Sequence, residues 1–388
     1  MRKLLISLFV LAPSVSSALE KLALVDSYDF AKAVDIETES GSARIVDHVM
    51  RTGCDTILWR NQSGSLPRYA SKEDSVVRAS YSLDDRRVAR NDIWGWTDLA
   101  RTELVRSACR YCATNGMRNV GFGIHLTFEE NHWDNWTFGT WNLDHPQFWC
   151  SKKGGNPWAG RASLAYDEVL EHKLRLLDEI VDLGATTVFL DLFRAGGWSV
   201  RFEYVKPMIQ AWRKEYGCEP PDDAEDERWL RLAAKPMNRY LRALSARCRA
   251  RGVRFLIGLT KMSVDESYIW RTYALDWKAL AAEGVFDGVV VTEVVVDGND
   301  AKGAVERTYR WVAANCGRAD FYASVSQYSY QYGYVRYAKD RGISEVEAVR
   351  ELLQLAEKSS AKGVILECVD WNNYSDGVCD VLNEKKAR

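Results

Sequence analysis

The sequence predicts an α/β fold, a (β/α)8 TIM barrel with long loops after strands 2, 3 and 4. Three observations over the 388 residues lead to this prediction. One sequence pattern recurs: an amphipathic helix, a glycine, then a short apolar strand that ends in a polar residue. Eight such strands can be counted, and the long connections follow three of them. A doubly wound open sheet is the alternative, but Asp26-Ser27-Tyr28-Asp29 replaces the Gly-rich loop expected after its first strand.

The predicted strands are short, nearly continuous apolar runs. Such runs are typical of parallel sheets whose two faces are both covered. Six of them follow a glycine that ends the preceding helix, because glycine accepts the left-handed conformation of a helix stop. The eight strands are residues 22–26, 56–59, 120–125, 187–191, 254–259, 288–293, 321–324 and 364–367.

Helices are predicted where apolar residues recur at i, i+3, i+4 and i+7. The clearest segments are 166–182, 237–251 and 345–358. Links from helix to strand are short, whereas residues 61–92, 127–163 and 195–227 form long connections after strands two, three and four. Barrel enzymes build their sites from the loops at this end of the strands, so we expect the site there.

The N-terminus has the layout of a secretory signal peptide. Arg2 and Lys3 precede the apolar stretch 4–12, and Ser16-Ser17-Ala18 supplies small residues for cleavage. We therefore divide the chain into a signal peptide, residues 1–18, and a single catalytic barrel domain, residues 19–388. The expected location is outside the cytoplasm: periplasmic, cell-surface or secreted.

Composition excludes several classes of protein. With 47% hydrophobic residues the chain is not of a disordered type. The net charge of −2, without basic clusters, argues against nucleic acid as a partner. No apolar run has the length of about 18–20 residues that a spanning helix needs. Nine cysteines leave disulfide connectivity and oligomeric state open, and packing is the expected role of Cys109 and Cys112 in a helix.

Polar and ionisable side chains follow almost every predicted strand. Carboxylates terminate strands one, four, six and eight, and their convergence around one cavity is unfavourable unless they perform chemistry or bind a ligand. The residues that we expect to bind substrate are Asp26, Tyr28, Trp59, Arg60, His125, Arg194, Lys261, Gln327, Asp370 and Trp371.

A pair of carboxylates suggests cleavage of a glycosidic bond. One carboxyl group protonates the leaving oxygen, while the other acts as nucleophile or activates water. Asp191, at the end of strand four, is the first candidate, and Arg194 could keep it ionised. Glu293 is the second candidate, and Glu367 is in reserve. Retention or inversion stays open, and no cofactor is expected.

One loop is rich in aromatic residues. Trp133, Trp136, Trp141, Trp149 and Trp158 all lie in the connection after strand three. Most of these rings are expected to pack together, and one or two at the cleft would suffice to stack on a sugar. Histidines flank the loop, but their spacing fixes no metal site, and we predict none.

The middle of the chain resembles a known family. Val188-Phe189-Leu190-Asp191-Leu192-Phe193-Arg194, then Tyr216-Gly217-Cys218-Glu219-Pro220 and Trp229-Leu230-Arg231, are similar to the secreted bacterial "family 10-like" glycosyl-hydrolase-like proteins. The likeness covers about a quarter of the chain. It implies a secreted TIM barrel that acts on a poly- or oligosaccharide, with Asp191 in the site, and implies no particular sugar.

The chain departs from the barrel glycosidases that include the xylanases. Those end strand four in Asn-Glu and carry a nucleophilic Glu on strand seven, where this chain has Asp191 and Ser324-Val325-Ser326-Gln327. A strand-four Asp with a strand-six acid is more similar to the α-galactosidase and α-glucosidase arrangement, by strand position alone.

Two further hypotheses remain. A non-catalytic carbohydrate-binding barrel would use the same rim without turnover. Alternatively, Lys261 at the end of strand five could form a Schiff base in an aldolase-like enzyme. Borohydride trapping with a carbonyl substrate distinguishes that second hypothesis.

Overall fold

A computed structural model gives the fold of most of the chain. It describes residues 18–26, 30, 33–35, 38–63, 66–67, 69–81, 88–90, 103–114, 121–127, 131–132, 137–155, 157–192, 199–264, 267–296, 300–327, 333–367 and 369–384. Residues 1–17 of the predicted signal peptide lie outside these ranges, as do Tyr28 and Arg194.

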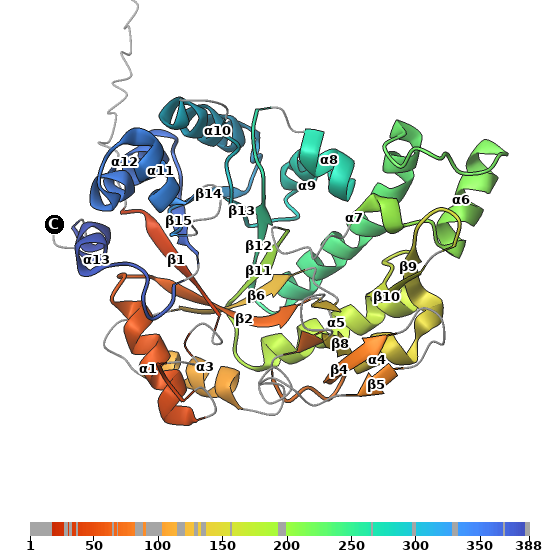
Figure 1. The fold of residues 1–388 in the computed structure, drawn as a ribbon, viewed down its shortest axis with the longest axis horizontal. Coiled ribbons are helices and arrows are strands. Elements are labelled where there is room, and N and C mark those ends of the chain that lie inside the picture. The colour runs from red at the N-terminus through yellow and green to blue at the C-terminus, as the bar shows by residue number, and fades with distance from the viewer. Residues whose placement is uncertain are drawn as a thin grey trace, which may run out of the picture.

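Eight of the described strands form a closed parallel barrel, which confirms the predicted fold (Figure 1). Each pairs with its neighbour in parallel register, and β1 pairs with both β2 and β15 to close the ring. All eight coincide with predicted strands, within a few residues at the ends. They are β1 (Glu20–Val25), β2 (Thr56–Ser63), β6 (Gly121–Thr127), β11 (Thr187–Asp191), β12 (Arg254–Leu259), β13 (Gly288–Val291), β14 (Asp320–Ser324) and β15 (Gly363–Leu366).

Helices surround the barrel (Figure 1). The segment predicted at 345–358 is a helix with those bounds, and a capping box of Ser344 and Glu347 fixes its start. The helix predicted at 237–251 begins ten residues earlier, at Glu227, where the Asp226 side chain caps it. The helices around the barrel include α1 (Glu39–Met50), α3 (Leu104–Thr114), α5 (Asp167–Asp182), α7 (Glu227–Ala250), α8 (Ser267–Tyr273), α9 (Trp277–Glu283), α10 (Ala301–Asn315), α11 (Tyr334–Arg341), α12 (Glu345–Lys358) and α13 (Asp376–Asn383).

Glycine ends helices as predicted. Gly284 caps α9 with φ +78°, and Gly317 follows α10 with φ +60°. At Gly317 a Cβ would lie 2.8 Å from the Cα of Ala282, so both the backbone conformation and the close packing require glycine.

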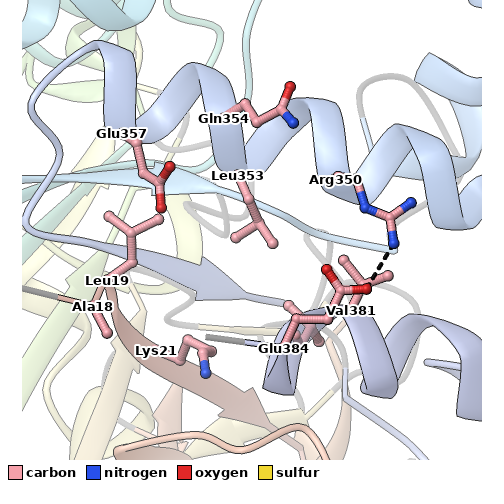
Figure 2. A pocket seen from close by; sticks show the side chains of 10 residues that line it. Ala18, Leu19, Lys21, Arg350, Leu353, Gln354, Glu357, Val381 and Glu384 are labelled. Carbon is pink, nitrogen blue, oxygen red and sulfur yellow. Dashed lines mark hydrogen bonds and ion pairs between the residues drawn. The ribbon is translucent and has the colours of Figure 1, made fainter. Parts of the chain in front are cut away.

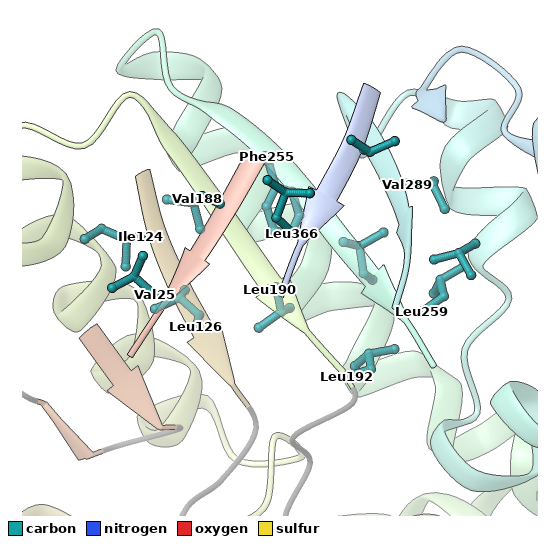
Figure 3. Close-up of a cluster of buried hydrophobic side chains, with 14 of the residues drawn as sticks. Val25, Ile124, Leu126, Val188, Leu190, Leu192, Phe255, Leu259, Val289 and Leu366 are labelled. Atoms are coloured by element: carbon teal, nitrogen blue, oxygen red, sulfur yellow. The ribbon is translucent and has the colours of Figure 1, made fainter. Parts of the chain in front are cut away.

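Strand residues alternate between two cores. Residues such as Val188, Leu190 and Val289 point outward and pack between strands and helices (Figure 3). The alternate positions fill the barrel interior, because successive side chains of a strand point to opposite faces. The interior group is Leu22, Leu24, Leu58, Phe189, Leu256, Val290, Tyr322 and Ile365.

The interior is closed at the N-terminal end of the strands by a polar cluster. Arg254 donates to both carboxylate oxygens of Glu20 at 2.9 and 3.2 Å. The Tyr322 hydroxyl donates to the same carboxylate at 2.8 Å. A pocket lies at this end too, between β1, α12 and α13, with an apolar wall of Leu353, Val381 and Leu382 (Figure 2).

The long connections after the second, third and fourth barrel strands carry small elements of their own. The second strand is longer than predicted, since it continues through Ser63 beside β6. No helix in the described ranges is both long and apolar enough to cross a membrane. The elements are β3 (Leu66–Pro67), β4 (Val76–Tyr81), β5 (Val88–Arg90), β7 (Asn131–His132), β8 (Thr137–Gly139), α4 (Thr140–Asp144), β9 (Trp149–Ser151), β10 (Pro157–Ala162) and α6 (Lys206–Tyr216).

Candidate active site

Four charged residues continue the interior columns of the barrel. Each lies two positions after an interior residue of its strand, so the same alternation turns its side chain inward at the C-terminal end. All four are buried: Asp26 is 7% exposed, Arg60 2%, Asp191 1% and Glu367 5%. The structure therefore places these predicted residues at one mouth.

Asp191 is the last residue of β11 and lies beside a glycine. A Cβ at Gly258 of β12 would meet the ring of Phe189 at 2.7 Å and Oδ1 of Asp191 at 3.1 Å. The absent side chain makes room for the carboxylate. Sequence reasoning did not identify Gly258, although a glycine inside an apolar strand is a signal for close approach.

Glu293 lies two residues after the end of β13, beside Thr260, which follows the neighbouring strand β12. Its carboxylate accepts a 2.8 Å hydrogen bond from the Thr260 hydroxyl and another from the backbone N–H of Lys261. Burial raises the pKa of Glu293, and the charge of Asp191 raises it further, while Thr260 and Lys261 oppose the rise. The charge of Asp191 acts on Glu293, so the two predicted carboxylates lie within electrostatic range of one another.

Glu367 lies on the β14 side of the mouth. Its carboxylate accepts a 3.0 Å hydrogen bond from the hydroxyl of Ser326, which lies 2.8 Å from the hydroxyl of Ser324. The Tyr374 hydroxyl donates to the backbone carbonyl of Glu367 at 2.8 Å. These contacts fix both the backbone and the side chain of Glu367.

Asp26 and Arg60 form a buried ion pair. Nη1 of Arg60 lies 2.9 Å from Oδ2 of Asp26. Both were predicted to bind substrate, and the structure brings them together on neighbouring strands. The pair places a fixed positive and a fixed negative group in the wall of the mouth.

Other predicted residues lie elsewhere. Trp59 is 1% exposed and packs in the outer core beside Phe122, so the expectation that its ring faces the mouth was wrong. The alternation of β2 turns Arg60 inward and therefore turns Trp59 outward. The carboxylate of Asp370 accepts hydrogen bonds from the backbone of Asn372 and Asn373, within its own turn.

The remaining predicted residues differ in their exposure and contacts. Trp371 is 36% exposed and stacks on His48 of α1, with ring centroids 4.5 Å apart. Gln327 is half-buried after β14, and Lys261 is exposed. His125 holds the β6 position in register with Arg60 and Phe189.

Tyr273 and Arg161, which act electrostatically on one another, were missed by the sequence reasoning. Tyr273 of α8 donates to the carbonyl of Leu192 at 3.2 Å, and the charge of Asp191 contributes to its raised pKa after burial and Tyr268. Arg161 of β10 is fully buried and opposes that rise in the pKa of Tyr273. Both come from connections distant in sequence, and no local pattern marks them.

The aromatic loop packs internally where it is described. Trp141 stacks between His145 and His172, at centroid distances of 4.4 and 4.2 Å. Trp149 is buried and donates to the carbonyl of Asn142. The packing role is confirmed for these two rings, whereas Trp133 and Trp136 lie outside the described residues. The described part of the chain holds no cluster of three metal-ligating side chains.

Comparison with known proteins yields structures and no sequence family. No family model matches the chain, and no curated protein matches it. The resemblance to the "family 10-like" proteins thus has no independent support from sequence.

Solved structures of glycoside hydrolases match nearly the whole chain. The glycoside hydrolase domain of PgaB (BpsB) from Bordetella bronchiseptica is 12% identical with a TM-score of 0.57, over 94% of this chain and 99% of that one. A chitinase from Chromobacterium violaceum is 9% identical with a TM-score of 0.51, over 96% and 100%. The Ostrinia furnacalis Group IV chitinase in complex with allosamidin is 10% identical with a TM-score of 0.53, over 95% and 99%.

The chain has a glycoside hydrolase-like barrel fold. At these identities the likeness concerns the fold alone. In barrels of this kind the site lies at the C-terminal ends of the strands. Asp26, Arg60, Asp191 and Glu367 lie at the same end, and the pocket of Figure 2 lies at the other.

Proposed function

We propose that the protein is a glycoside hydrolase in which Glu293 is the general acid and Asp191 the nucleophile or base. The observation that carries this proposal is the burial of Glu293, 8% exposed, with its carboxylate held by Thr260 and within range of the charge of Asp191; burial and that charge both raise its pKa. A carboxyl group with a raised pKa near a second carboxylate is the combination that glycosidic cleavage needs.

The contacts of each residue suit its role. The Glu293 carboxyl group delivers its proton to the leaving oxygen, and the hydrogen bond from Thr260 fixes its direction. Asp191 attacks the anomeric carbon, or removes a proton from the water that does so. In either route one water is consumed and two sugar fragments are released.

Other groups at the mouth would bind the sugar. The Asp26–Arg60 pair offers a hydrogen-bond acceptor and a hydrogen-bond donor for the hydroxyl groups of a sugar ring. The two opposite charges cancel, so the pair adds no net charge to the mouth. Glu367, held by Ser326, is the reserve candidate for the second carboxylate. We infer that the substrate is a poly- or oligosaccharide outside the cytoplasm, since the N-terminus has the layout of an export signal.

A hydrolysis screen tests this function. The exported protein is incubated with a broad panel of polysaccharides and aryl glycosides, beside its Asp191→Asn and Glu293→Gln variants. Release of sugar by the wild type and loss of that release in both variants supports the proposal. Glu20→Gln is the matched control, because it removes a carboxylate charge at the opposite end of the barrel.

The same panel distinguishes a non-catalytic carbohydrate-binding barrel. Such a protein would be retained on an affinity gel carrying one glycan but would release no sugar. The Asp191→Asn and Glu293→Gln variants would then keep most of that affinity. Release of sugar that persists in both variants would contradict the residue assignment and leave the activity standing.

A further inference from the structure

The residue that follows Thr260 has an unusual backbone conformation. Lys261 has φ +49°, in the left-handed region that residues other than glycine rarely adopt. In this conformation its backbone N–H bonds the Glu293 carboxylate, while the next residue, Met262, donates its N–H to the Glu293 carbonyl at 3.0 Å. Strained backbone of this kind occurs at functional sites, where the surrounding structure maintains it.

The side chain of Lys261 contacts Tyr268, whereas its backbone contacts Glu293. Its ammonium lies over the ring of Tyr268, with Nζ 4.8 Å from the ring centroid. In the described part of the chain Lys261 forms no ion pair with Glu293. The positive charge is therefore close enough to lower the pKa of Glu293, yet not in contact with its carboxylate.

Tyr268 lies on α8, and contacts within this helix and with the residue that follows β11 fix its ring. The edge of Tyr273 meets it at a centroid distance of 6.1 Å and an angle of 84°. Tyr273 in turn donates its hydroxyl to the carbonyl of Leu192, the residue after Asp191. Through Tyr273, the Tyr268 ring is thus linked to the residue that follows Asp191, the other candidate carboxylate.

We propose that Tyr268 is a positioning residue that holds the Lys261 ammonium off the Glu293 carboxylate, so that Glu293 keeps its proton for the leaving group. A cation over an aromatic face gains from the negative electrostatic potential of the ring, which competes with the carboxylate for the ammonium. The purpose of this arrangement rests on the proposed function, whereas the arrangement itself rests on the contacts above.

The charges that face Glu293 define what the loss of Tyr268 would do. Among the described residues, Asp191 on β11 and Lys261 after β12 act on its carboxylate. Asp191 favours the protonated form, and Lys261 favours the ionised form. Without the ring, the ammonium would be free to contact the carboxylate, and contact with an opposite charge lowers the pKa of a carboxyl group.

Four variants test the proposal. Tyr268→Leu removes the aromatic face, whereas Tyr268→Phe keeps it and loses only the hydroxyl. Lys261→Met removes the charge, and the Tyr268→Leu/Lys261→Met double variant removes both partners. Titration of ¹³C-carboxyl-labelled glutamate by NMR reports the pKa of Glu293 directly, with its signal assigned by its disappearance in Glu293→Gln.

The expected pattern is specific. Tyr268→Leu lowers the pKa of Glu293, Tyr268→Phe leaves it near the wild-type value, and Lys261→Met raises it. In the double variant the pKa returns to or above the wild-type value, because no ammonium remains. Hydrolysis on the basic side of the pH–rate profile falls by about tenfold in Tyr268→Leu, because a lower pKa leaves less of the acid protonated.

An unchanged Glu293 titration in Tyr268→Leu would overturn the proposal. If Tyr268→Leu fails to fold, Lys261→Met still decides, because the proposal requires its pKa to rise. The NMR readout needs no substrate, which separates the two proposals. A shift as expected in a protein that cleaves no glycoside would support the positioning and contradict the proposed function. Cleavage that depends on Asp191, with no shift in Tyr268→Leu, would do the reverse.

Discussion

Gly258 and Asp191 face one another inside the barrel, on neighbouring strands. A side chain at 258 would begin 3.1 Å from the carboxylate oxygen and 2.7 Å from the ring of Phe189. Neither neighbour has room to move, because both lie in the barrel interior with 0–1% exposure. The position of the candidate nucleophile thus depends on the absence of a side chain from the next strand.

Gly258→Ala is therefore expected to reduce both stability and activity. Overpacking of an interior by one methyl group costs about 1–3 kcal/mol. Displacement of a catalytic group by about 1 Å can lower the rate about a hundredfold. Denaturant unfolding and hydrolysis rates measure the two effects. Adding Phe189→Leu should restore most of the stability, and a variant with wild-type stability and rate would contradict the packing argument.

Thr260→Val should move the basic limb of the pH–rate profile to higher pH. The Thr260 hydroxyl favours the ionised form of Glu293, so its loss raises the pKa of the acid. The rate at the optimum should fall about tenfold, because the carboxyl group loses its orientation. Thr260→Ser keeps the hydroxyl and serves as the control. A limb that stays in place in Thr260→Val would show that Glu293 does not set it.

Glu293 should also make stability depend on pH. Burial raises its pKa in the folded state above the unfolded value, so the native state binds this proton more tightly. The resulting stabilisation is complete below the unfolded pKa and is lost as pH rises through the folded pKa. Relative to Glu293→Gln, the wild type should thus lose unfolding free energy as pH rises from the ordinary glutamate range, about pH 4, through the raised folded pKa. Parallel pH dependences of the two proteins would rule out a raised pKa.

Arg254→Met should separate stability from catalysis. The substitution leaves Glu20 and Tyr322 without their cation at the N-terminal end of the barrel. Loss of a partly buried charged hydrogen-bond partner costs about 1–3 kcal/mol. Activity per folded molecule should stay unchanged, because the mouth lies at the opposite end. A fall in kcat without loss of stability would indicate that this cluster is part of the site.

The barrel could be predicted because its strands have a recognisable pattern in the sequence. A strand buried on both faces reads as an apolar run, and the glycine before it marks the helix stop. The same property hid which face each residue occupies. Trp59 and Arg60 are consecutive residues of β2, and both are buried. The strand therefore shows no alternation of buried and exposed residues that would have assigned Arg60 to the interior and Trp59 to the outer core.

Site residues were predictable only where they end a barrel strand. Asp191 and Glu367 follow apolar runs directly, and Glu293 comes two residues after one. Tyr273 of α8 lies within electrostatic range of both Asp191 and Arg161 of β10, and this arrangement depends on how long connections fold back over the mouth. Such tertiary contacts have no local periodicity.

The most direct test of the account compares leaving groups in the two carboxylate variants. Aryl glycosides of one sugar are hydrolysed by the wild type, Asp191→Asn and Glu293→Gln, with leaving groups of low and high pKa. If Glu293 is the acid, Glu293→Gln should retain much of its rate on the activated substrate and lose it on the one that needs protonation, whereas Asp191→Asn loses both. Equal losses on both substrates in Glu293→Gln would contradict the assignment of Glu293 as the proton donor.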